Sequence, residues 1–202
     1  MRGEIKESRL AYKSEWLEVY EDLLCIDDAK PDKRGKKNNH YHNKNTNNVK
    51  LFNKIKLKSD SATIIPVFSD GSLLMIEAYR RGVDEFLLDL PSGLIEDNEK
   101  PYETAKRELL QETGYSCRTL DHLGWFYTWP SKSNQKSYLF LAKGLEKTSR
   151  QNLDAIENIN TKIVTRDKAK AKKPGNKKCW RCMCTLLWIS AIRLVNYFII
   201  CL

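Results

Sequence analysis

Two glutamates four residues apart, Glu108 and Glu112, have the residue type and spacing that best suit chemistry in this chain. Residues 101–113 are predicted to form one helix, because Pro101 suits a first helical turn and Gly114 suits a left-handed position after the last one. Side chains four apart on a helix share a face. Two carboxylates so placed repel each other, and a hard cation such as Mg²⁺ would remove that repulsion.

Other side chains of the same helix support this arrangement. Gln111 lies three residues after Glu108 and falls on the same face, where its amide oxygen is a weaker metal ligand than a carboxylate. Ala105, Leu109 and Thr113 occupy a different face and are expected to pack on a sheet.

Residues 93–115, GLIEDNEKPYETAKRELLQETGY, resemble the Nudix box, the signature of hydrolases that cleave a nucleoside diphosphate linked to another group. The family usually has Glu where this chain has Gln111. The resemblance implies that Arg107 and Glu99 brace a loop–helix–loop and that Gly93 makes its tight turn. The implied ligands of Mg²⁺, or of Mn²⁺ in its place, are the backbone carbonyl of Ser92 and the side chains of Glu108, Gln111 and Glu112.

Further stretches resemble ADP-ribose pyrophosphatases. The sequences EAYRR and LDLPSG precede the box as in that subfamily, and Arg80 is expected to contact the phosphates or terminal ribose because a guanidinium matches phosphate bidentately. Pro130 and Ser131 resemble a Pro-Ser loop and are assigned to substrate binding. Residues 154–159, DAIENI, resemble an acidic loop that carries a catalytic carboxylate, so Glu157 is the candidate general base. The alternatives are a surface ion pair for Arg80 and a plain surface role for Glu157.

The expected fold class is α/β, a Nudix α/β/α sandwich with a mixed sheet. Apolar segments at 62–68 and 72–79 flank Asp70-Gly71, which is a hairpin signal. Further strands are predicted at residues 86–90, 118–128 and 137–142.

Three segments are expected along the chain. Residues 1–60 contain N-terminal strands and an exposed, mobile polar loop at 28–50, and residues 61–165 form the Nudix domain. The chain has 35 Lys/Arg and 26 Asp/Glu, but residues 161–202 hold 10 Lys/Arg and one acidic residue. The rest is therefore neutral, with 25 of each sign, and no nucleic-acid partner is expected.

Residues 166–202 form a tail in which a basic run precedes mostly apolar sequence. Residues 183–202, as a helix, would span about 30 Å, roughly the bilayer core. Three interpretations are open. The tail could be a membrane anchor, although Arg193 at mid-span opposes insertion. It could instead pack on the domain or a dimer partner, or result from a lost reading frame, which the abrupt change in composition favours.

These features predict a Mg²⁺-dependent enzyme that hydrolyses ADP-ribose to AMP and ribose 5-phosphate, with Glu108, Glu112, Arg107 and Glu157 as its catalytic set. Water deprotonated by Glu157 or by a box glutamate would attack one phosphorus. A nucleotide sugar or dinucleotide is the alternative substrate. A module that binds ADP-ribose or RNA without cleaving it is the alternative from another class, because Gln111 removes one carboxylate.

The resemblance also implies a homodimer, since the family commonly exchanges N-terminal strands. No apolar segment follows Met1, and the cysteine spacing suggests neither disulfides nor zinc. A cytoplasmic location is therefore expected.

Overall fold

The computed structural model describes residues 4–25, 49–155 and 157–165, which fold into two compact units. One unit contains the described part of Met1–Ser59 together with Tyr127–Gln135, and the other contains Asp60–Phe126 together with the described residues from Lys136 onward. The tail at 166–202, and most of the polar loop at 28–50, lie outside the described residues.

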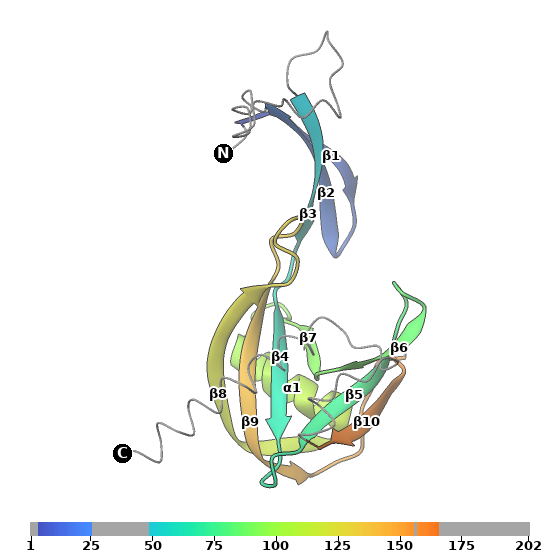
Figure 1. Ribbon diagram of the computed structural model, residues 1–202, viewed down its shortest axis with the longest axis vertical. Coiled ribbons are helices and arrows are strands. Elements are labelled where there is room, and N and C mark those ends of the chain that lie inside the picture. The colour runs from blue at the N-terminus through green and yellow to red at the C-terminus, as the bar shows by residue number, and fades with distance from the viewer. Residues whose placement is uncertain (1–3, 26–48, 156, 166–202) are drawn as a thin grey trace, which may run out of the picture. The chain divides into compact units, whose positions relative to one another are not determined.

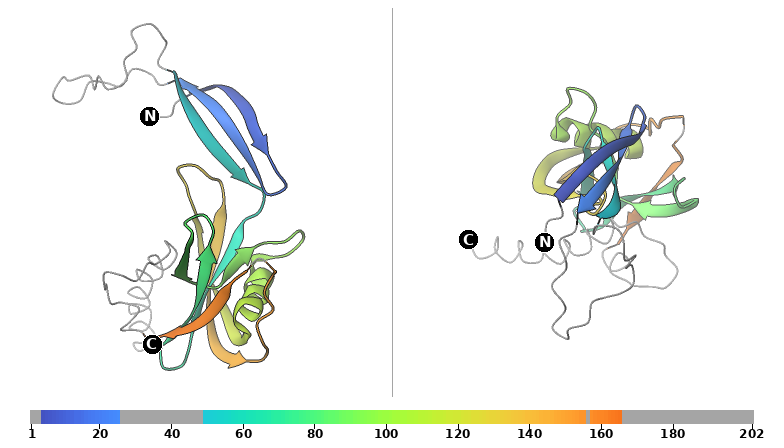
Figure 2. Two further views of the ribbon diagram at one scale, coloured as in Figure 1. Left: turned by 90° about the vertical axis from the view of Figure 1, so that its right-hand side faces the viewer. Right: turned by 90° about the horizontal axis from the view of Figure 1, so that it is seen from above.

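The first unit is built on a three-stranded antiparallel sheet (Figure 2). Its strands, in sheet order, are β1 (Glu4–Lys13), β2 (Leu17–Cys25) and β3 (Val49–Leu57). β3 is not among the predicted strands, and its first two residues lie within the predicted polar loop at 28–50, so that loop ends earlier than predicted. Its sequence alternates only in part, because apolar Val49, Leu51, Ile55 and Leu57 fit a period of two that Phe52 and Asn53 interrupt.

The second unit is a seven-stranded mixed sheet with one helix packed against it (Figure 1). Its central order is β10-β5-β4-β9-β8, with β6 added to β5 and β7 added to β4. β4 and β9 are parallel, whereas the registered pairs of β4 with β5 and β7, and of β5 with β6 and β10, are antiparallel. The strands are β4 (Ser61–Val67), β5 (Leu73–Arg80), β6 (Glu85–Asp89), β7 (Ser92–Leu94), β8 (Tyr115–Tyr127), β9 (Lys136–Lys147) and β10 (Ile159–Val164).

The sheet opens between β4 and β5, and this opening positions the segment that leads into the helix. The two strands form the predicted hairpin, but their registered pairing is limited to Val67 and Leu73 beside the turn. Beyond that point β7 pairs with the start of β4, and β6 pairs with the end of β5. The amide of Ile64 also donates to the carbonyl of Pro91 at 2.9 Å, so the chain between β6 and β7 is held against β4.

Helix α1 (Pro101–Thr113) begins and ends as predicted. Pro101 occupies its first turn, and Gly114 adopts φ 74° and donates its N–H to Leu110. A β-carbon at Gly114 would lie 2.4 Å from the carbonyl oxygen of Ser149, so both conformation and space require glycine there. Ala105 and Leu109 of α1 pack in one core cluster with strand residues of β4, β5, β8 and β9, namely Ala62, Ile64, Leu74, Leu120, Phe140 and Ala142.

The mixed sheet with a packed helix confirms the α/β class predicted from the sequence. α1 is the single helix among the described residues, so these show one helical layer of the expected sandwich. β7 and β10 were not predicted, and β8 begins at Tyr115 rather than at residue 118. Within the described part of the chain, no helix has the length and apolar character needed to cross a bilayer.

Candidate active site

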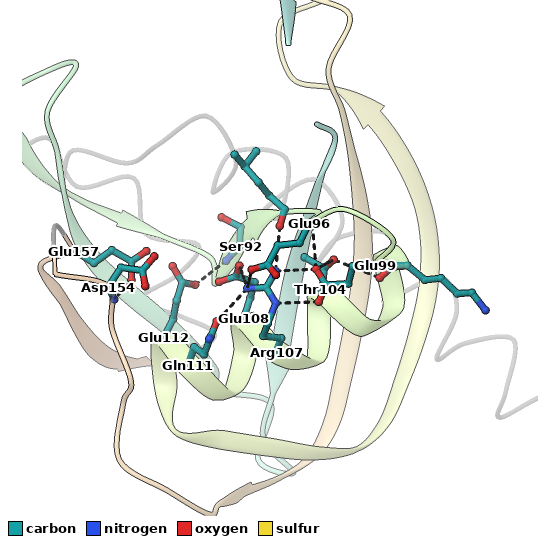
Figure 3. A network of polar contacts seen from close by, with 12 residues as sticks. Ser92, Glu96, Glu99, Thr104, Arg107, Glu108, Gln111, Glu112, Asp154 and Glu157 are labelled. Atoms are coloured by element: carbon teal, nitrogen blue, oxygen red, sulfur yellow. Dashed lines mark hydrogen bonds and ion pairs between the residues drawn. The ribbon is translucent and has the colours of Figure 1, made fainter. Parts of the chain in front are cut away.

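The two glutamates of α1 lie close to the loop that precedes the helix. Glu108 and Glu112 are only 8% and 2% exposed. One carboxylate oxygen of Glu112, Oε2, accepts the amide N–H of Ser92 at 2.7 Å, and Glu108 Oε1 accepts from Arg107 Nη1 at 2.7 Å. Glu112 points toward Ser92, as Figure 3 shows, and the carboxylate of Glu108 lies next to Gly93.

Gly93 lies closer to Glu108 than the sequence indicated. It lies in strand β7, paired with Ala62, and an added β-carbon would stand 1.8 Å from Glu108 Oε1. The resemblance implied that glycine is needed here for a tight turn. The structure gives a different reason, because a side chain at this position would displace the carboxylate of Glu108.

Arg107 is the centre of the polar network around the helix (Figure 3). Its Nε and Nη2 donate to the two carboxylate oxygens of Glu99 at 2.9 and 2.8 Å, a bidentate pair. Nη2 also donates to the carbonyl of Leu94 at 3.1 Å. Thr104 Oγ1 donates to Glu99 Oε2 at 2.7 Å. These contacts tie the loop to the helix, and the Arg107 guanidinium lowers the pKa of Glu99 to about 2.

Gln111 lies on the expected face but already has a partner. Its Oε1 accepts from Arg107 Nη1 at 3.0 Å, from the same nitrogen that donates to Glu108. The amide oxygen that the sequence offered as a metal ligand is thus engaged with a guanidinium. Its role toward a metal stays a prediction.

The site concentrates negative charge in a poorly hydrated place. The pKa of Glu112 is raised to about 8, chiefly by burial; the charges of Glu108 and Glu157 also raise it, and the Ser92 N–H and Arg80 oppose the shift. Burial also raises the pKa of Glu108, against the opposing effect of Arg107. Two carboxyl groups with raised pKa values, crowded together, are the electrostatic signature of a site suited to a cation or to proton transfer.

Glu157 reaches this cluster from a loop that is distant in sequence. It is exposed, and its Oε2 accepts the amide N–H of Asp154 at 3.0 Å. In Figure 3 the side chains of Glu157 and Asp154 lie on the Glu112 side of the network. The negative charge of Glu157 contributes to the raised pKa values of both Glu108 and Glu112. The fold therefore groups three predicted carboxylates, although their catalytic roles remain predictions.

Arg80, at the end of β5, forms an ion pair with Asp89, at the end of β6. Its Nη2 donates to Asp89 Oδ2 at 2.7 Å, and Asp89 is 1% exposed. The positive charge of Arg80 also lowers the pKa of Glu112. An ion pair is present, as the alternative interpretation supposed. Its partner is buried, which holds the guanidinium in one orientation near the carboxylates.

Pro130 and Ser131 belong to the other unit. They are exposed in the segment between β8 and β9, where the amides of Lys132 and Ser133 donate to the carbonyl of Trp129 at 3.0 and 2.8 Å. The amide of Ile55 donates to the backbone carbonyl of Lys132 at 2.8 Å, which ties this segment to β3. The assignment of Pro130 and Ser131 to substrate binding stays a prediction.

The donor set of the site fits a hard divalent cation in its chemistry. Glu108 and Glu112 supply carboxylate oxygens, and Mg²⁺ is usually held by one or two carboxylates together with waters and substrate phosphates. Among residues 4–25, 49–155 and 157–165, no three His, Cys, Asp or Glu side chains converge to hold a metal on their own. Any such ion would therefore take its other ligands from the backbone, from water or from substrate.

A family model for the NUDIX domain matches residues 58–182, which is more than half of the chain and includes all of α1. The chain belongs to the Nudix family. Its similarities to curated and solved proteins fall in the ADP-ribose pyrophosphatase-like part of that family.

Two curated relatives illustrate this similarity. The chain is 33% identical over 110 residues to the methanol dehydrogenase activator of Bacillus methanolicus. It is 30% identical over 110 residues to an ADP-ribose pyrophosphatase of Bacillus subtilis (strain 168). Each match covers 54% of this chain and 60% of the relative, so the chain spans less than two thirds of these proteins.

A solved crystal structure of an ADP compounds hydrolase shares the fold. It superposes with a TM-score of 0.73 at 19% identity, covering 98% of this chain and 96% of that one. The expected Nudix fold is thereby confirmed.

Proposed function

We propose that this protein is a Mg²⁺-dependent hydrolase that cleaves the diphosphate of ADP-ribose, or of a closely related nucleoside diphosphate sugar, to AMP and a sugar phosphate. The observation that carries the proposal is the pair of buried carboxylates, Glu108 beside Gly93 and Glu112 bonded to the Ser92 amide, with the charge of Glu157 close enough to affect both. The relative named ADP-ribose pyrophosphatase supports this substrate class.

The cation, Mg²⁺ or Mn²⁺, would be held by Glu108, Glu112 and the carbonyl of Ser92, with Gln111 as a weaker candidate. When bound, it supplies charge neutralisation for the diphosphate and acidifies water. Arg107 keeps Glu108 in place through a 2.7 Å hydrogen bond. Burial of the helix carboxylates keeps bulk water away from their charges.

The remaining steps are assigned to residues around that pair. Glu157 accepts the proton of the attacking water, because it is exposed and lies beside the cluster. Arg80 binds a phosphate oxygen while Asp89 fixes its orientation. The new bond joins the water oxygen to phosphorus and the bond to the bridging oxygen breaks, so AMP and ribose 5-phosphate leave.

A second candidate is a module that binds ADP-ribose or RNA without cleaving it. The observation in its favour is Gln111, whose amide oxygen accepts from Arg107 and adds no negative charge. The retention of both Glu108 and Glu112 favours the enzyme.

A turnover assay separates these cases. The purified full-length chain is incubated with Mg²⁺ and ADP-ribose, UDP-glucose or NADH, and AMP or UMP release is followed by chromatography. Release of AMP from ADP-ribose, lost in Glu112→Gln, is expected. Tight binding with no AMP, and no effect of Glu112→Gln on binding, would support the binding module instead. Faster turnover of UDP-glucose or NADH would move the assignment to nucleotide sugars or dinucleotides.

We further propose that the protein acts as a homodimer in the cytoplasm. Support for the dimer comes from the first unit, where the edge strand β1 and its neighbours expose the apolar side chains Ile5, Leu10, Tyr12, Trp16 and Leu51. Such a surface is typical of an interaction site. Sedimentation equilibrium of wild type and Tyr12→Ser tests it, and a concentration-independent monomer mass for wild type would disprove it.

A further inference from the structure

The carboxyl-terminal turn of α1 is capped almost entirely by one segment of chain. The last carbonyls of a helix have no partner within the helix and must find donors elsewhere. Here the carbonyl of Gln111 accepts the amide of Asn152 at 2.9 Å, and that of Glu112 accepts Gln151 Nε2 at 2.5 Å. Lys147 Nζ donates to the carbonyl of Thr113 at 3.2 Å.

Gln151 differs from the other donors because its amide group has a second acceptor. Its Nε2 also donates to the carbonyl of Ile159 at 3.3 Å. Ile159 is buried, begins β10 and pairs with Ala78 of β5. One side-chain nitrogen therefore joins the helix to the first residue of a core strand, across the loop formed by residues 152–158.

That loop carries Glu157, and its described residues bond to one another and to β5. The amide of Glu157 donates to the carbonyl of Asp154 at 2.9 Å, and the amide of Asp154 donates back to Glu157 Oε2 at 3.0 Å. The carbonyl of Asn158 accepts the amide of Tyr79 at 3.1 Å. Because Asp154 and Glu157 bond each other, holding the two ends of the loop helps to hold the Glu157 carboxylate in place.

We propose that Gln151 is a positioning residue for the reaction, whose amide ties both ends of the loop bearing Glu157 to the helix bearing Glu108 and Glu112. Gln151 donates to the backbone carbonyl of Glu112, and in Figure 3 the side chain of Glu112 is on the side of the polar network where Glu157 lies. This inference rests on the proposed role of Glu157 as the general base. Gln151 touches no reacting atom and acts only through that loop.

The test compares two substitutions that each remove one donor from the same helical turn. Gln151→Met keeps the side-chain length and loses both hydrogen bonds. Lys147→Met loses the bond to Thr113 but leaves Ile159 and the loop untouched, so it reports the cost of a missing cap. With ADP-ribose and Mg²⁺, we expect Gln151→Met to lower kcat about 10- to 100-fold with little change in KM, and Lys147→Met to lower it less than about threefold.

A double-mutant cycle with Glu157→Gln gives a readout that a purely structural role would not move. If Gln151 acts by placing Glu157, then Gln151→Met should cost nothing further once Glu157 is Gln. Losses that simply multiply, or an equal loss in Lys147→Met, would reduce Gln151 to an ordinary helix cap and overturn the proposal.

Hydrogen exchange separates a failure of this inference from a failure of the proposed function. The amides of Glu157 and Tyr79 should exchange at least about tenfold faster in Gln151→Met than in wild type, and remain unchanged in Lys147→Met. Unchanged exchange in Gln151→Met overturns the tie even if the wild-type chain proves inactive. Should Gln151→Met fail to fold, Gln151→Glu replaces the donor group by an acceptor at the same length and is judged by the same measurements.

Discussion

The amide of Ser92 and the carboxylate of Glu112 are joined by a hydrogen bond of 2.7 Å, which links the segment before the box to the helix that follows it. A glutamine at position 112 can still accept this N–H, so its replacement tests charge with little change in fold. The consequence concerns metal binding, because a glutamine oxygen is a poorer ligand for a hard cation.

We expect Mg²⁺ to stabilise the wild-type chain and not Glu112→Gln. At a free concentration 100 times the Kd, a ligand specific for the folded state adds about 2.7 kcal/mol. Thermal unfolding with EDTA and with saturating Mg²⁺ measures this. Glu103→Gln, which removes an exposed carboxylate from the first turn of α1, should retain the Mg²⁺ response. An equal response in Glu112→Gln would place the ion elsewhere.

Gly93→Ala is expected to lower kcat on the order of 10²-fold, because the new β-carbon would occupy the space of Glu108 Oε1 and displace that carboxylate. The matched control is Gly82→Ala, where an added β-carbon meets nothing within 4 Å. Steady-state kinetics of both variants are compared with wild type. Wild-type kcat in Gly93→Ala would mean that the position of Glu108 is unimportant for turnover.

The ion pair of Glu99 and Arg107 predicts that the free energy of unfolding falls at low pH. The folded-state pKa of Glu99 is lowered to about 2 from the ordinary 4.5, so its contribution is fully present above pH 4.5 and is lost as the pH falls toward 2. Urea unfolding at pH 6, 4 and 3 should show a loss of a few kcal/mol in wild type that is smaller in Glu99→Gln.

Glu103→Gln is the control for that measurement, because it removes a helix carboxylate outside the Arg107 network. If Glu99→Gln and Glu103→Gln lose stability in parallel with wild type, the pairing of Glu99 with Arg107 contributes nothing measurable.

Gln111→Glu is expected to bind Mg²⁺ about tenfold more tightly, since the affinity of such sites follows the number of charged ligands. Isothermal titration calorimetry measures the change. Leu110→Glu adds the same charge at the neighbouring exposed position. It controls for a gain in Mg²⁺ affinity that comes only from added negative charge near the site. Equal gains in both variants would show that Gln111 lies outside the coordination sphere.

Local signals in the sequence were sufficient for the helix and the hairpin. Pro101 and Gly114 mark the ends of α1 through fixed dihedral preferences, and Asp70-Gly71 marks the turn between β4 and β5, where Gly71 has φ 80°. β7 could not be predicted, because three residues are too few to carry a period and its pairing depends on β4.

The residue types and spacing thus determined a helix that presents Glu108, Gln111 and Glu112 on one side, and the family to which the chain belongs. Only the tertiary structure decided that burial raises the pKa of Glu112, that Glu157 joins the pair, that Gly93 must leave space for Glu108 and that Gln151 ties the acidic loop to α1. Helical geometry and turn dihedrals are properties of neighbouring residues. Desolvation and contacts between distant segments exist only once the whole sheet has formed around the helix.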